Sequence, residues 1–165
     1  MLKENIVALI TPFDSNGDID YVMLKKLIAF HVFSSTDALV ILGTTSEAAT
    51  LTNKEKEDIV KFIIKENNHR LKIVVGVSEN NTLIAKEKAV LYEELGADYL
   101  LVLTPYYNKC NEEGLYQHFK LISDNINIPI ILYNVPTRTN VNIPMSVYER
   151  LKNNVDVLCH SYCYT

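Results

Sequence analysis

A tyrosine, an amide and an arginine follow one another at the end of a short apolar run. Ile130–Leu132 is too short for a buried helix and lies between two prolines, which is typical of a strand covered on both faces. Tyr133, Asn134 and Arg138 come directly after it. Because parallel α/β sheets carry out chemistry at the carboxyl ends of their strands, we expect a functional site here.

More hydroxyl groups follow earlier apolar runs. Thr44, Thr45 and Tyr107 each lie just after a predicted strand. A phenol can exchange protons through a hydrogen-bonded threonine, and an arginine can bind a carboxylate with two parallel hydrogen bonds. Together with Tyr133 and Arg138, these groups favour chemistry on a keto acid. The spacing alone also permits a structural interpretation, in which Tyr133 ends a strand and Thr44 lies in a turn.

Predicted strands and helices alternate along the chain. The strands are expected at 6–10, 38–42, 73–77, 99–103 and 130–133, with a sixth beginning at 155–158, and the helices near Asp20, Thr52, Thr82, Glu112 and Pro144. This alternation predicts a parallel sheet, either doubly wound or closed as a (β/α)8 barrel. The first strand is not followed by the G-x-G-x-x-G of a dinucleotide-binding sheet, which favours the barrel.

The length predicts that the barrel is not complete. A (β/α)8 barrel typically takes about 250 residues, and the chain has 165. We therefore expect an α/β fold that is an incomplete (β/α)8 barrel, covering about five βα units plus the start of strand six. Such a sheet exposes two edges and interior side chains, so we expect poor solubility, partial folding or dependence on a partner.

Composition restricts the kinds of partner and compartment. The formal net charge of −4 offers no basic field for nucleic acid or anionic lipid, which favours small molecules. No apolar run approaches the roughly 20 residues that span a bilayer, and residues 1–5 lack the apolar core of a signal peptide. Three cysteines without CxxC spacing fit a reducing compartment. We expect a cytoplasmic protein.

Four ordered motifs resemble those of the dihydrodipicolinate synthase family, also called 4-hydroxy-tetrahydrodipicolinate synthases. They are Thr-Pro-Phe at 11–13, Gly-Thr-Thr-x-Glu at 43–47, Tyr-Tyr at 106–107 and Tyr-Asn-Val-Pro-x-Arg-Thr at 133–139. The resemblance implies a pyruvate-dependent (β/α)8 lyase of the class I aldolase type, acting in lysine biosynthesis by the diaminopimelate pathway. In that family a lysine forms a Schiff base with pyruvate, whose enamine attacks L-aspartate 4-semialdehyde. No cofactor and no metal are implied.

The resemblance also implies roles for individual residues. Tyr133 is implied as the proton-relay phenol, with Thr44 linking it to Tyr107. In the family this second tyrosine reaches across a dimer interface, so a homodimer or tetramer through the Tyr107 region is implied. Thr45 is expected to hold the pyruvate carboxylate, and Arg138 that of the semialdehyde. Arg138 favours the synthase over another pyruvate aldolase, such as an N-acetylneuraminate lyase, which binds a polyhydroxylated partner.

Two positions depart from the family pattern. Ser46 stands where the family has glycine, and if that turn needs a positive φ we expect strain. Counting along strand six puts Ser161 where the family has its nucleophilic lysine, and a hydroxyl cannot form an iminium. We therefore divide the chain into 1–158, the amino-terminal part of one barrel, and 159–165, a tail that departs from the pattern. A shifted reading frame followed by early termination would produce such a tail.

The missing lysine leads us to expect that this chain is inactive by itself. The alternative is a non-catalytic remnant that associates with a full-length homologue through the Tyr107 region. A metal site built from Cys159, His160 and Cys163 is disfavoured because no fourth ligand is evident. His118 is expected at a helix end or on the surface, and the charged run 54–58 on a solvated helix face.

Overall fold

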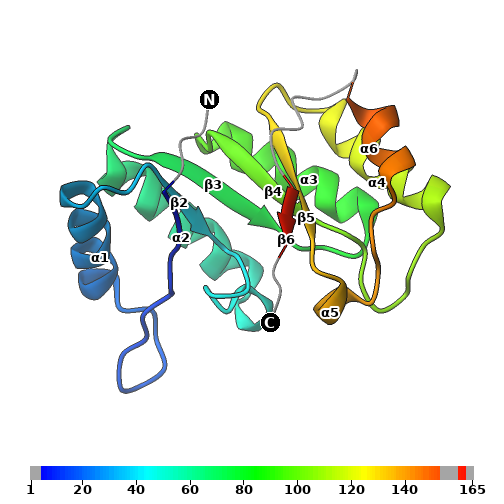
Figure 1. The fold of residues 1–165 in the computed structure, drawn as a ribbon. Helices are drawn as coiled ribbons and strands as arrows, with labels where there is room; N and C mark the ends of the chain where they lie inside the picture. The colour runs from blue at the N-terminus through cyan, green and yellow to red at the C-terminus, as the bar shows by residue number, and fades with distance from the viewer. Residues whose placement is uncertain (1–4, 153–159, 163–165) are drawn as a thin grey trace.

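The computed structural model describes residues 5–152 and 160–162, which contain one curved sheet of parallel strands (Figure 1). The strands are β1 (Ile6–Ala8), β2 (Ala38–Ile41), β3 (Lys72–Val77), β4 (Tyr99–Leu103), β5 (Ile130–Asn134) and β6 (His160–Tyr162). They pair in chain order, and every pair is parallel. Within the described residues β1 and β6 are the edges of the sheet. The predicted incomplete barrel is confirmed.

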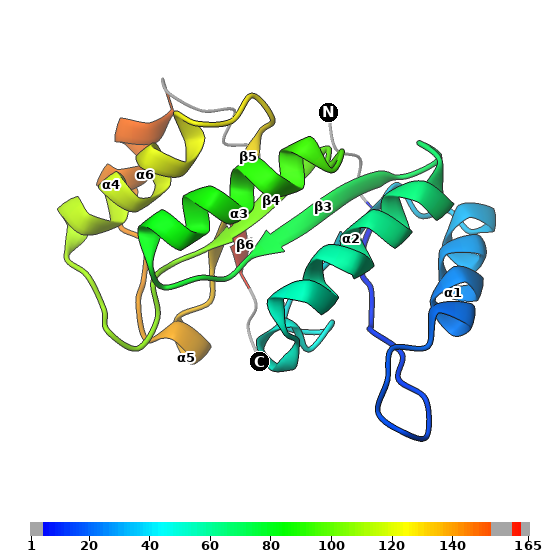
Figure 2. The same ribbon diagram turned by 180° about the vertical axis from the view of Figure 1, so that it is seen from behind.

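Helices cover the outer side of this sheet (Figure 2). The helices of the described residues are α1 (Tyr21–Phe33), η1 (Ala48–Thr50), α2 (Asn53–Asn67), α3 (Thr82–Glu94), α4 (Glu112–Ser123), α5 (Pro136–Thr139) and α6 (Met145–Leu151). The short helices η1 and α5 lie in loops that follow β2 and β5, and the sequence did not predict them. The predicted strand at 155–158 and the predicted boundary after residue 158 lie outside the described residues.

Local signals in the sequence explain where the longer helices begin and end. The Asp20 carboxylate accepts a hydrogen bond from the Met23 N–H at the start of α1. Thr52 and Glu55 form the predicted capping box at the start of α2. Gly96 lies just beyond the carboxyl end of α3 and has a φ of +101°. This left-handed backbone conformation favours glycine, so Gly96 marks the end of the helix. These contacts involve neighbours in sequence, so they could be predicted without the fold.

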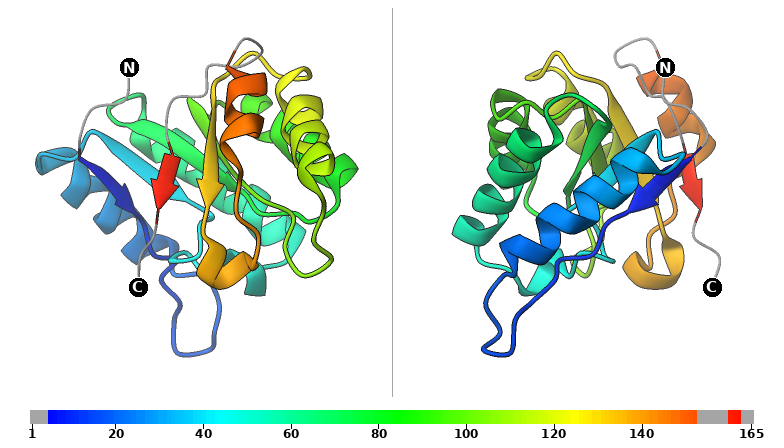
Figure 3. Two further views of the ribbon diagram at one scale, coloured as in Figure 1. Left: turned by 45° about the vertical axis from the view of Figure 1, so that its right-hand side comes forward. Right: turned by 90° about the vertical axis from the view of Figure 1, so that its left-hand side faces the viewer.

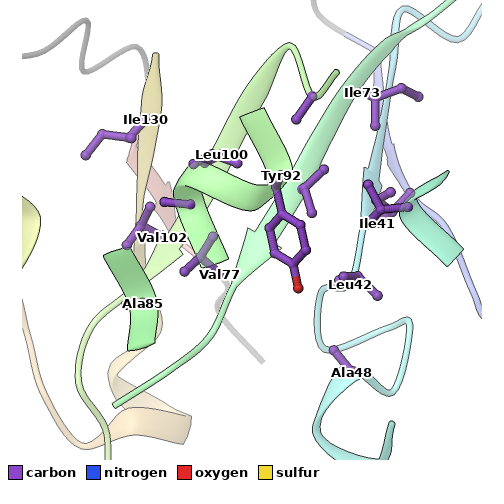
Figure 4. Packing of buried hydrophobic residues seen from close by; sticks show 14 of the residues in the cluster. Ile41, Leu42, Ala48, Ile73, Val77, Ala85, Tyr92, Leu100, Val102 and Ile130 are labelled. Carbon is purple, nitrogen blue, oxygen red and sulfur yellow. The ribbon is translucent and has the colours of Figure 1, made fainter. Parts of the chain in front are cut away.

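The outer faces of the strands form the main core with the helices. Leu100 and Val102 of β4 and Ile130 of β5 are buried in this core, and Figure 4 shows Val102 near Ala85 of α3. In the same view the ring of Tyr92, also on α3, lies toward the end of β3. This core holds the helices against the sheet and so positions the loops at the carboxyl ends of the strands.

The inner face of the sheet is better covered than the sequence predicted. Ala38, Val74, Tyr99 and Ile131 come from four adjacent strands, form their own cluster, and are at most 8% exposed. The curvature of the sheet brings these side chains against one another, so the expectation of exposed interior residues is wrong for these four positions. The same expectation is confirmed at the open edge of the sheet, where two of the three residues of β1 are exposed.

Candidate active site

The turn after β2 brings the threonines to the carboxyl end of the sheet. Its backbone is closed by bonds from the Ser46 N–H to the Gly43 carbonyl (3.2 Å) and from the Glu47 N–H to the Thr44 carbonyl (3.1 Å). Thr44 and Thr45 are both exposed on this turn. The turn therefore presents both hydroxyls outside the hydrophobic core, as the sequence predicted.

Ser46 is not strained in this turn. The left-handed residue is its neighbour Glu47, with a φ of +55°, whereas Ser46 is not among the residues with positive φ. Ser46 is 2% exposed, and its hydroxyl donates to the Leu9 carbonyl at 2.6 Å. The Thr11 hydroxyl donates in turn to the Ser46 carbonyl at 2.8 Å. The strain expected for a positive φ is therefore absent at Ser46, and the serine side chain ties the turn to the segment after β1.

Tyr133 lies in β5, half-buried, between two strands of the sheet. Its register partner in β4 is Leu103, and its register partner in β6 is Ser161. Neighbouring strands are about 4.8 Å apart, so residues in register are adjacent. The position that the sequence count assigned to the family lysine is therefore next to Tyr133, and a serine occupies it.

Arg138 lies on α5, in a loop that is tied back to the end of β5. The Arg138 N–H donates to the Val135 carbonyl at 2.9 Å, and the buried Thr139 hydroxyl donates to the same carbonyl at 3.1 Å. Asn134 is fully buried, and its amide donates to the Asn142 side chain at 2.8 Å. These bonds hold the loop while the Arg138 side chain stays exposed.

Tyr107 lies at the surface, in the loop after β4. It has a φ of +67°, and its side chain is 92% exposed. The preceding Tyr106 is 37% exposed, and its carbonyl accepts a hydrogen bond from the Asn108 N–H at 2.8 Å. Tyr107 thus extends away from the part of the molecule described here.

A cavity of about 410 Å³ lies at the carboxyl ends of the strands and reaches between α2 and α3. Thr44 and Arg138 both line it, together with Tyr106. Thr45, Tyr107 and Tyr133 are not among its lining residues. Of the residues predicted from the sequence, the structure therefore brings Thr44 and Arg138 to one cavity and leaves the other three outside it.

Charged residues that sequence reasoning missed also line the cavity. Lys56 of α2 is 16% exposed, with its Nζ 3.8 Å from the carboxylate of Glu79. Tyr92 of α3 also lines the cavity. Burial, together with the negative charges of Glu79 and Glu57, raises the pKa of its phenol. The prediction of a solvated helix face at 54–58 is thus wrong for Lys56. Lys56 precedes the buried Ile59 by three residues, which places both on the same side of α2, and this spacing could have indicated that Lys56 is partly buried.

His118 is buried, contrary to the expectation from the sequence. It lies within α4, is 1% exposed, and its Nδ1 is 3.0 Å from the Thr82 hydroxyl of α3. Burial lowers the pKa of the His118 imidazole to about 4, although the Leu103 carbonyl acts in the opposite direction. His118 follows Leu115 by three residues, which places both on the inner face of α4. The imidazole is a polar part of the core.

Neither a metal cluster nor a membrane span is found in residues 5–152 and 160–162. No three His, Cys, Asp or Glu side chains are arranged there to hold an ion. The alternative metal site rests on Cys159, His160 and Cys163, whose side chains lie outside the described part of the chain. None of the described helices is both long enough and apolar enough to cross a bilayer.

Comparison with known proteins places the fold and its motifs in a family. The sequence profile of the Dihydrodipicolinate synthetase family matches residues 1–160. The chain belongs to this family. It is 46% identical over 153 residues to the 4-hydroxy-tetrahydrodipicolinate synthase of Clostridium perfringens strain SM101, covering 93% of this chain and 52% of that relative. Over 156 residues it is 43% identical to the synthase of Aquifex aeolicus, covering 94% and 53%.

Solved structures of this family share the same arrangement. The dihydrodipicolinate synthase of Aquifex aeolicus superposes with a TM-score of 0.91 at 42% identity, covering 98% of this chain and 55% of that one. The chloride-inhibited synthase of Acinetobacter baumannii, solved in complex with pyruvate, gives a TM-score of 0.95 at 39% identity, covering 99% and 56%. The chain therefore spans about half the length of the relatives it matches.

Proposed function

We propose that this chain provides the amino-terminal share of a 4-hydroxy-tetrahydrodipicolinate synthase active site and does not form the Schiff base by itself. The reaction of such a site is the condensation of pyruvate with L-aspartate 4-semialdehyde. The observation that carries the proposal is the register of β5 and β6, in which Ser161 pairs with Tyr133. Family membership over residues 1–160 supports the assignment of the reaction.

The described residues suit the proton transfers and anionic substrates of this reaction. In our proposal Tyr133 relays protons through Thr44 to the Tyr107 of a second chain, because iminium formation and breakdown require both delivery and removal of protons. Thr45 binds the pyruvate carboxylate. Arg138 binds the semialdehyde carboxylate, for which a guanidinium offers two parallel hydrogen bonds. The shared cavity of Thr44 and Arg138 supports the part of this proposal that concerns those two residues.

The chemistry of Ser161 explains why we propose inactivity for the chain. A lysine amine adds to the pyruvate ketone and then loses water, which leaves a carbon–nitrogen double bond that accepts the electrons of the adjacent carbon. A serine hydroxyl adds to a ketone only as far as a hemiketal, which has no such electron sink. The chain therefore lacks the group that activates pyruvate at the position beside Tyr133.

Borohydride trapping tests this proposal. The purified chain is incubated with pyruvate and sodium borohydride, and the intact mass and peptide map are then recorded. We expect no pyruvyl adduct on the parent chain and an adduct at residue 161 in Ser161→Lys. Ser161→Ala is the matched control and should stay unmodified. A stable adduct on the parent chain would overturn the proposal.

The exposed Tyr107 favours a second candidate function, association with a full-length homologue. An aromatic side chain that is 92% exposed is unusual on an isolated surface and common at interfaces between chains. In this candidate the chain is a non-catalytic partner, and the same region would support a homodimer or tetramer in the cytoplasm. Co-purification with a complete synthase, weakened by Tyr107→Ala, is the expected result. A chain that stays monomeric beside that synthase argues against it.

A further inference from the structure

Helix α1 carries large apolar side chains on its outward side as well as on its core side. Leu24 and Ile28 are each 1% exposed and pack in the main core. Other apolar side chains of α1 remain open to solvent, and they are Val22 (69%), Met23 (42%), Phe30 (64%) and Phe33 (88%). A helix that is apolar on all sides is typical of a position covered on all sides. We call these four exposed residues the α1 patch.

The α1 patch lies on one side of the helix, away from α2. At about 100° of rotation per residue, the four residues fall within about 100° of arc, with Lys26 between them. Helix α2 lies on a different side of α1. There the Tyr21 ring packs edge-on against Phe62 with centroids 4.9 Å apart, and Lys25 is 2.9 Å from the Glu66 carboxylate. Helix α2 therefore does not cover the patch.

The strand beside α1 is open as well. Within the described residues β1 pairs only with β2, so the backbone groups on its other edge can form hydrogen bonds with a further strand. Ile6 in β1 is 39% exposed, and Ile10 just beyond it is 50% exposed. Figure 3, in its right-hand view, shows α1 and β1 together on the side of the molecule that faces the viewer. An exposed apolar edge strand next to an apolar helix face is a surface that favours pairing.

We propose that the α1 patch and the free edge of β1 form one docking surface, and that its occupant is the carboxyl-terminal βα portion of a homologous synthase chain. A strand of that portion pairs with β1 in parallel. The helix connected to this strand covers Met23 and Phe30, which lie on the side of α1 away from α2. This surface is separate from the Tyr107 region.

Barrel geometry selects this occupant. An eight-stranded barrel has no edges because its last strand pairs with its first, and its last helix lies beside its first helix. The described sheet has six strands, and the chain covers 52–56% of the relatives' lengths. The remaining part of those relatives therefore holds βα segments with the topology that the β1 edge requires. A second copy of this chain would bring six more strands, and a barrel of that size is too wide for its side chains to fill.

Co-refolding of two separate chains tests the proposal. The full 165-residue chain is refolded together with the part of the Clostridium perfringens synthase that follows the matched region, so that neither partner needs to fold first. Complex formation is measured by size-exclusion chromatography with light scattering, and hydrogen exchange is followed at the amides of β1. The readouts need no pyruvate and no catalysis, so they are independent of the proposed function.

We expect a 1:1 complex in which the β1 amides gain protection from exchange. Phe30→Glu and Met23→Glu should weaken binding at least about tenfold, since they place a charge in the covered interface. Leu83→Glu on α3 is the matched control, because Leu83 is 59% exposed but lies away from α1, and it should bind like the parent.

Two results would overturn the proposal. One is a fragment that fails to bind, or that binds Phe30→Glu as tightly as the parent chain. The other is a chain that self-associates through the α1 patch, so that the fragment does not compete and Phe30→Glu yields monomers. In that case the occupant is a second copy rather than the carboxyl-terminal portion of a relative.

Discussion

Helices α1 and α4 cover the same sheet in very different surroundings. Helix α4 lies between α3 and α6 (Figure 1). Its Phe119 is fully buried. Arg150 of α6 contacts α4 twice, with its guanidinium 3.6 Å above the Tyr116 ring and 2.7 Å from the Glu113 carboxylate. Helix α1 has α2 on one side, and its Phe33 is 88% exposed. Although α1 is the more apolar helix, α4 is the better buried. Neighbouring helices, rather than apolarity alone, decide the burial of a helix.

The largest effect on stability is expected when one phenylalanine on each of the two helices is replaced. We expect Phe119→Ala to lower the free energy of unfolding by about 3–5 kcal/mol, because it leaves a cavity in the core. The matched change Phe33→Ala should alter it by less than about 0.5 kcal/mol, since the side chain already contacts water. Urea unfolding followed by circular dichroism measures both. Equal losses for the two variants would show that α1 is covered in solution.

The buried imidazole of α4 provides the next test. The pKa of His118 is about 4 in the folded chain, against an ordinary value of 6.5. Between these values the unfolded chain binds a proton that the folded chain does not, so stability falls as the pH falls from 6.5 to 4 and then levels off. We expect a loss of about 3 kcal/mol across this window. It is measured as the urea midpoint at each pH.

The control for this pH dependence is His118→Gln. This variant keeps a polar side chain at the position but cannot titrate, so the difference between parent and variant isolates the imidazole from the carboxylates. If the parent and His118→Gln show the same slope between pH 6.5 and 4, His118 does not carry the effect.

The smallest of these changes in stability is expected at Ser46, whose hydrogen bonds connect the turn after β2 to the segment after β1. We expect Ser46→Ala to cost about 1–2 kcal/mol, because the buried Leu9 carbonyl loses the donor at 2.6 Å. Ser46→Gly should cost at least as much, since this position does not need a positive φ. Urea unfolding again gives the values. A glycine variant more stable than the parent would mean that the serine is strained after all.

Much of the fold could be predicted because its signals are local. The caps at Asp20 and Thr52, the apolar runs of the strands and the βα alternation all depend on residues close together in sequence. The ordered motifs around Thr44 and Tyr133 were sufficient to indicate the family, which the match over residues 1–160 bears out. The roles of individual site residues remain predictions, because they depend on how side chains from separate strands and loops meet a substrate.

Other features depended on contacts between distant segments, and only the tertiary structure decided them. Lys56 lies in a charged run that resembles a solvated face, but the fold brings it to the cavity, with its Nζ 3.8 Å from the carboxylate of Glu79 in the loop after β3. His118 is polar and still buried, because Thr82 of another helix meets its ring. Ser46 could have been strained, but the fold places the left-handed conformation at Glu47. Periodicity and capping act over a few residues and are written in the sequence, whereas burial, charge environment and turn geometry are set by segments that meet only when the sheet has formed.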